Sequence, residues 1–252
     1  MKNLFKKIKP ISGFSHLFHF GLTILLPLFV FIFVRLDFTQ LAVALIVLSK
    51  WRMFAVKPRF WPANIRANSV DIIVGFSVIV FMFHSSGPGW QLLWALVYAI
   101  WLTVIKPAQT SFLVSVQSLV AQLFGLMAIY SWESATGLEL TVMTGFVCFL
   151  SARHFFDNFE EPYARLMSYT WGYFGAALAW ILSYWLLFYG TIAQPTLILT
   201  IVGYAVASIY YLNKTNKLNR LLQRQFIIIM VIVVISILVF GILRLGNQIT
   251  KS

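Results

Sequence analysis

The sequence predicts an all-helical bundle that crosses a membrane many times. Of its 252 residues, 60% are hydrophobic and only 10% are charged, and the mean hydropathy is +0.86. A soluble domain carries about a quarter charged residues to cover its surface. The apolar residues also fall in long runs separated by short basic segments. These observations predict a polytopic integral membrane protein, with residues 1–252 forming a single transmembrane domain and no separate soluble domain.

Nine apolar runs are candidates for membrane-spanning helices, which need about 20 residues, or somewhat fewer where long side chains reach the interface. The first run follows a basic N-terminus without a small-residue cleavage site, so we expect it to be retained and not removed as a signal peptide. Runs 36–49 and 140–152 are short enough to be buried or re-entrant. The nine runs are 17–34, 36–49, 70–84, 90–105, 111–130, 140–152, 166–189, 195–212 and 226–245.

Basic residues set the predicted orientation. With a cytoplasmic N-terminus and nine crossings, all of the 19 lysines and arginines except Arg35, Arg244 and Lys251 lie in cytoplasmic segments. Removing either short run would move later basic loops outside, against the positive-inside rule. The sequence therefore predicts nine spans, a cytoplasmic N-terminus and an external C-terminus in a cytoplasmic-type membrane, and the short loops favour a bacterial source. Topology accounts for the net charge of +12, so we expect no nucleic-acid partner.

Small residues recur at helical spacing in two of the runs. This spacing lets helix backbones approach closely, so we expect run 166–189 to lie centrally in the bundle. Run 226–245 is aliphatic on every face and is expected at the lipid edge. The predicted helix-packing residues are Gly172, Gly175, Ala176, Ala179 and Ser183 in the seventh run, and Gly203 and Ala207 in the eighth.

The interiors of the runs hold few polar groups. No Asp, Glu, Lys or Arg lies near the middle of any run, which argues against an ion-coupled transporter because such proteins place ionisable groups at depth. Gln117 and Gln122 are the main polar residues there, and they serve either interhelical hydrogen bonding or a substrate path. The one cysteine, Cys148, lies inside a run and predicts neither a disulfide nor a cysteine-ligated zinc site.

Segment 153–165, RHFFDNFEEPYAR, is the most charged stretch outside the basic loops and contains three of the seven acidic residues. A helix through it would place His154, Asp157 and Glu161 on one face, at i, i+3 and i+7. Together with His16 and His19, such residues can hold a divalent metal where helix ends converge. The alternatives are surface ion pairs and, for Asp71, a place at a helix N-terminus. The candidate metal ligands are His154, Asp157, Glu160, Glu161 and Asp71.

Two basic loops are candidates for holding a phosphate or a lipid headgroup. In the second loop the basic residues share one helical face and leucines another, which is typical of a segment lying on an anionic membrane leaflet. Contact with membrane lipids is enough to explain both loops. Their candidate residues are Lys57, Arg59, Arg66, Lys217, Arg220 and Arg224.

The layout resembles that of the UbiA-type intramembrane prenyltransferases, which have nine spans, a cytoplasmic N-terminus and functional loops after the second and sixth spans. In that family both loops carry aspartate-rich motifs, the first of the form NxxxDxxxD, that bind a magnesium-held prenyl diphosphate. In the first loop, the nearest stretch here contains Asn64, Asn68 and Asp71. It lacks the middle aspartate of the motif, and its final aspartate comes one position earlier than in the motif. The second loop contains DNFEE at 157–161. The resemblance covers the threading of the chain and no intact motif.

These features lead to two functional hypotheses. The first, which we prefer, is a non-enzymatic membrane protein: a scaffold or partner subunit, or a binder or passive conductor of an apolar or lipid-like molecule. The alternative is a transferase acting on a lipid or isoprenoid diphosphate at the cytoplasmic face, which would require Mg²⁺. Expected partners are membrane lipids, an apolar ligand, and a membrane protein or a second copy of the chain.

Overall fold

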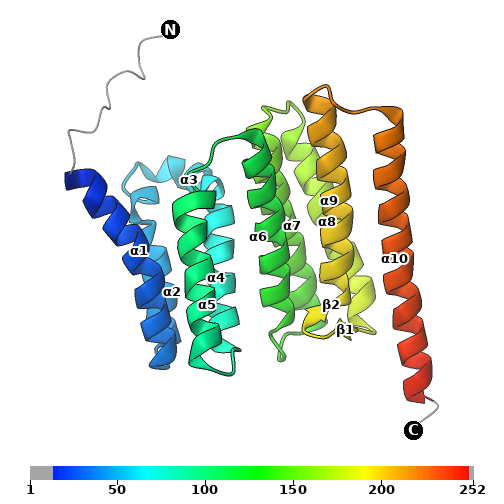
Figure 1. Cartoon of the computed structure of the whole chain (residues 1–252), viewed down its shortest axis with the longest axis horizontal. Coiled ribbons are helices and arrows are strands. Elements are labelled where there is room, and N and C mark those ends of the chain that lie inside the picture. The colour runs from blue at the N-terminus through cyan, green and yellow to red at the C-terminus, as the bar shows by residue number, and fades with distance from the viewer. Residues whose placement is uncertain (1–13, 250–252) are drawn as a thin grey trace. The chain divides into compact units, whose positions relative to one another are not determined.

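The computed structural model describes residues 14–249, which form helices joined by short loops and one short β-hairpin (Figure 1). The predictions for the basic N-terminus and for Lys251 concern residues outside this range, and those for His16, His19 and Arg244 concern side chains outside the described part. The described residues group into two compact units: one comprises the chain up to Val56 and Val78–Ala108, the other Lys57–Ser77 and the chain from Gln109 onward.

The first unit is built from apolar helices. It contains α1 (Phe14–Arg35), α2 (Thr39–Ser49), the short helix η1 (Trp51–Met53), the C-terminal part of α4 (Ser69–Phe83), α5 (Pro88–Ile100) and η3, a π-helical turn (Trp101–Ile105) that continues α5. Helix α1 packs against α2 and α5. Pro88 begins α5, where its missing N–H costs nothing because the first turn of a helix has no internal acceptor.

The second unit holds most of the chain. Its elements are η2 (Pro58–Phe60), α3 (Trp61–Ala67), the start of α4, α6 (Ser111–Tyr130), α7 (Gly137–Asn158), α8 (Ala164–Ser183), β1 (Phe188–Tyr189), β2 (Ile192–Ala193), α9 (Gln194–Lys214) and α10 (Arg220–Ile249). Helix α7 packs on α6 and α8, and α9 packs on α6 and α10 (Figure 1).

The apolar helices are those of a membrane-associated protein. In the described part of the chain, four helical segments are long and apolar enough to cross a membrane: 88–105, 111–130, 194–214 and 220–241. A fifth is obtained if α4 and the short helices before it, bent by 62° at residue 68, form one span. Each of the nine predicted runs falls largely within a helix, and nine membrane crossings stay a prediction.

Helices α7 and α8, with 22 and 20 residues, are about 30 Å long, which matches a bilayer, although they are less apolar than the four. Their small and polar residues lie mostly between helices, where Thr144, Ser151 and Ser168 are at most 2% exposed. Their lower hydropathy therefore reflects contacts inside the protein.

Close backbone contact joins α7 to α8. A Cβ added to Gly172 would lie 3.0 Å from the carbonyl oxygen of Gly145, and one added to Gly145 would lie 3.0 Å from the Cβ of Ala176. Gly175 faces Cys148 in the same way, and Ala179 is 1% exposed. The predicted small residues of the seventh run thus lie along this interface. The interface extends to the last residue of α8, Ser183, which lies close to Gly137 at the start of α7.

Two predicted boundaries are wrong. Run 166–189 was expected to be helical to its end, but α8 stops at Ser183 and the chain then forms the β1–β2 hairpin, whose turn contains Gly190 at φ 65°. An apolar run does not distinguish a helix from a hairpin by hydrophobicity alone. At the sixth run, α7 continues past residue 152 to Asn158.

The end of α7 also corrects the expected face of segment 153–165. Glu160 adopts a left-handed conformation at φ 50°, and Pro162 follows, which disfavours helical geometry at Glu161. Glu161 therefore lies in the α7–α8 turn and not on the helical face of His154 and Asp157.

Candidate functional site

A cavity of about 570 Å³ lies among α6, α7, α8 and α9 in the second unit. Its volume is within the usual range for small-molecule sites. Among the described residues that line it, none is charged, and most are aliphatic or aromatic. The principal lining residues are Ser118 and Gln122 from α6, Ser151, Phe155 and Phe156 from α7, Met167, Trp171 and Phe174 from α8, and Gly203, Val206, Ala207 and Tyr210 from α9.

The cavity opens between α8 and α9. These two helices contact one another little compared with the α7–α8 and α6–α9 pairs. Leu166, Met167 and Phe174 of α8 and Val206 of α9 line the cavity and are also exposed on the surface of the unit. If these helices cross a bilayer, the opening faces lipid and not water.

A hydrogen-bonded cluster stabilises the deep end of the cavity, away from the α7–α8 turn. Trp171 Nε1 donates to Gln122 Oε1 (2.8 Å), and Gln122 Nε2 donates to the carbonyl of Leu199 (3.0 Å). A Cβ added to Gly203 would lie 3.0 Å from Gln122 Nε2 and 3.3 Å from a ring carbon of Trp171. Glycine at 203 therefore leaves the space in which the amide and the indole meet, and Ala207 continues the same wall one turn later.

A polar cluster lies at the other end, where the α7–α8 turn meets the end of α9. Lys214 Nζ lies 2.7 Å from Glu161 Oε2, and the hydroxyl of Tyr210 donates to the same carboxylate. These two partners, Lys214 first, lower the pKa of Glu161 below its ordinary value because they stabilise the ionised form. Tyr210 belongs both to this cluster and to the cavity wall, so the charged groups lie directly beside the apolar volume.

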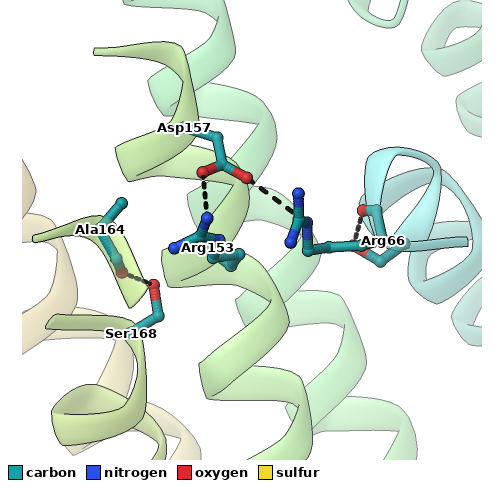
Figure 2. A network of polar contacts seen from close by, with 6 residues as sticks. Arg66, Arg153, Asp157, Ala164 and Ser168 are labelled. Carbon is teal, nitrogen blue, oxygen red and sulfur yellow. Dashed lines mark hydrogen bonds and ion pairs between the residues drawn. The ribbon is translucent and has the colours of Figure 1, made fainter. Parts of the chain in front are cut away.

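A second ionic cluster involves the last turns of α7. Figure 2 shows Asp157 between two guanidinium groups: Arg153 Nη2 lies 2.9 Å from Oδ1, and Arg66 Nε, from α3, lies 3.6 Å from Oδ2. Asp157 and Arg66 are partly exposed, so their pair contributes little to stability. Arg153 is more buried, and its pairing with Asp157 one turn later offsets part of the cost of its charge.

Three of the five candidate metal ligands are engaged by other side chains. Asp157 and Glu161 form the ion pairs described above, and a ring nitrogen of His154 lies 3.1 Å from Gln117 Oε1. Asp71 is 5% exposed in the first turn of α4, and Glu160 is exposed. Among the side chains that the structure describes, no three His, Cys, Asp or Glu come together as a possible metal site; His16 and His19 are not among them.

The candidate headgroup residues lie in two separate segments. Lys57 and Arg59 are exposed at η2, where the guanidinium of Arg59 lies 4.5 Å from the ring centre of Phe60. Lys217 is exposed in the loop after α9, and Arg220 and Arg224 are exposed in the first turns of α10. Of these six residues, Arg66 forms an ion pair with Asp157.

Sequence reasoning missed the cavity. It identified Gln122 as a polar group at depth that either bonds between helices or lines a substrate path; the structure shows that Gln122 bonds between helices and also lines the cavity. Ser151, Trp171 and Tyr210 gave no separate signal, because serines and aromatics are frequent in all the runs.

Comparison of the chain with protein-family models, with curated proteins and with solved structures finds no match.

Proposed function

We propose that the protein is a non-enzymatic binder of an apolar, lipid-like molecule, held in the cavity among α6–α9. The observation that carries this proposal is the combination of an uncharged lining with an opening between α8 and α9. An apolar molecule that leaves water for such a cavity gains about 25 cal/mol for each Å² of its surface that is buried. A molecule that enters from the bilayer gains instead from shape and from contacts with the aromatic walls.

The membrane setting is part of the same proposal. We place the chain in the cytoplasmic membrane of a bacterial cell, with nine crossings, the N-terminus inside and the C-terminus outside. The distribution of basic residues supports this threading. The exposed apolar surface of α10, which includes Ile229, Ile232 and Phe240, supports contact of this helix with lipid.

Photolabelling tests the binding site. Purified protein in nanodiscs is irradiated with a neutral alkyl diazirine, and the labelled residues are mapped by peptide mass spectrometry. We expect labelling of the cavity-facing residues of α8 and α9, suppressed by Ala207→Phe, which fills the cavity. The matched control is Ala44→Phe, at an exposed alanine of α2. Uniform labelling of all exposed apolar residues, unchanged by Ala207→Phe, would show simple lipid contact and refute the binder.

Cysteine accessibility tests the threading. Cys148 is buried, so the natural background is low. Ser86→Cys, in the predicted external turn, should react with an impermeant maleimide in cells whose inner membrane is intact. Lys217→Cys should react only after that membrane is opened. Reaction of both positions from the same side would rule out the nine-crossing threading.

A further inference from the structure

Ser151 differs from the other hydroxyl groups of the cavity. It lines the cavity, is 2% exposed, and its Oγ has no hydrogen-bond partner among the described residues. A buried hydroxyl without a partner costs about 1–3 kcal/mol. Such a group in an otherwise satisfied wall needs an explanation, and a ligand that accepts its proton supplies one.

Serines elsewhere in these helices show what Ser151 does not do. Ser118 donates to the carbonyl of Val114 (3.1 Å), Ser115 to Ser111 (2.8 Å) and Ser168 to Ala164 (2.6 Å), each one turn back in its own helix. This bond is the usual way for a helical serine to satisfy its hydroxyl in an apolar setting. The hydroxyl of Ser151 lacks it.

The remaining polar groups of the wall are already engaged. Thr170 donates to Leu166, Tyr210 donates to Glu161, and Gln122 and Trp171 bond to one another. Ser151 is thus the one described hydroxyl in the cavity wall that is left to donate to a bound molecule. A charged group beside it would have no counter-charge in the lining, and burying an unpaired charge is far more costly than burying a neutral oxygen.

We infer that the ligand is a neutral long-chain molecule with a hydrogen-bond-accepting oxygen, an ester or ketone carbonyl, which accepts a hydrogen bond from Ser151 Oγ. The inference rests on the proposed binding function and adds the chemistry of the ligand. The carbonyl lies at the Ser151 side of the cavity, and the chain extends along Phe155, Met167 and Val206 toward the opening between α8 and α9.

Competition against the alkyl photoprobe in nanodiscs tests the inference with three compounds of similar length: octadecane, methyl hexadecanoate and hexadecanoate. In the wild type, the ester should compete about fivefold better than the alkane, which corresponds to one hydrogen bond. In Ser151→Ala this preference should vanish while octadecane competes as before. Ser118→Ala, a cavity serine already bonded to its own helix, should keep the preference.

The outcomes separate the two proposals. If octadecane and the ester compete equally in wild type and Ser151→Ala, the cavity binds apolar chains and the assignment of a carbonyl ligand is wrong. Stronger competition by ionised hexadecanoate than by the ester overturns the neutral ligand. If none of the three compounds displaces the probe from α8 and α9, the binding function itself fails.

Discussion

Gly175→Ala should destabilise the protein, although alanine is the better helix former. An added Cβ would lie 2.7 Å from Cys148 Sγ and 3.1 Å from Cys148 Cβ, and Cys148 is fully buried. Overpacking of this kind costs about 1–3 kcal/mol, and we take the upper value because both contacts are tight. Replacing a helical glycine returns about 1 kcal/mol, so the net loss is about 2 kcal/mol.

Thermal unfolding in detergent, followed by circular dichroism, measures this effect. A loss of about 2 kcal/mol lowers Tm by roughly 4–8 °C for a chain of this size. The control is Gly21→Ala in α1, where nothing lies within 4 Å of the added Cβ, and Tm should hold or rise. Cys148→Ala removes the Sγ contact, so the double variant should be more stable than the sum of the single effects predicts. Strict additivity, or a Gly175→Ala protein as stable as the wild type, would refute the account of the α7–α8 interface.

Three further predictions concern single side chains. Burial, and then the charge of Lys106 beside it, lowers the pKa of Lys50 in the folded protein. Between about pH 7 and pH 9 the unfolded chain therefore binds more protons than the folded one, and the free energy of unfolding should rise with pH. Lys50→Met should flatten this rise, and an equal rise in the variant would contradict the prediction. Thr136→Ala removes the hydroxyl that accepts from the backbone N–H of Glu139, the third residue of α7, and should cost about 1 kcal/mol, measured as a lower Tm. Thr136→Ser keeps a capping hydroxyl and should cost little. An equal loss in both variants would exclude capping as the cause. Gln122→Met leaves Nε1 of the partly buried Trp171 without its acceptor and removes the extra bond to the Leu199 carbonyl, so it should cost about 1–3 kcal/mol in unfolding free energy; no measurable change would show that water replaces the amide.

Run length and charge predicted the helices well because both are local properties of the chain. Each of the nine apolar runs falls largely in a helix, and the spacing of Gly172 and Gly175 placed small residues where α7 and α8 meet. The hairpin after Ser183 was not predicted, because Tyr184 and Trp185, which precede it, and Phe188 and Tyr189 of β1 are apolar residues that a helix could equally contain. Boundaries therefore depended on turn conformations that hydrophobicity does not encode.

The cavity could not be predicted because it depends on how four helices diverge, and not on any one of them. Lining residues such as Phe155 and Val206 look like ordinary core or lipid-facing residues in their own helices. Segment 153–165 drew attention through its charges, and the structure shows that Asp157 and Glu161 are neutralised by Arg153 and Lys214. What that segment does provide is Phe155 and Phe156, which form part of the apolar wall of the cavity.

Anomalous diffraction from crystals soaked with a bromine-terminated long-chain alkane tests the central claim most directly. The account predicts a bromine peak inside the cavity, within contact distance of Trp171, Phe155 or Val206, that disappears in Ala207→Phe. Bromine found only on the outer faces of α1 and α10, with the α6–α9 cavity unoccupied in the wild type, would contradict it.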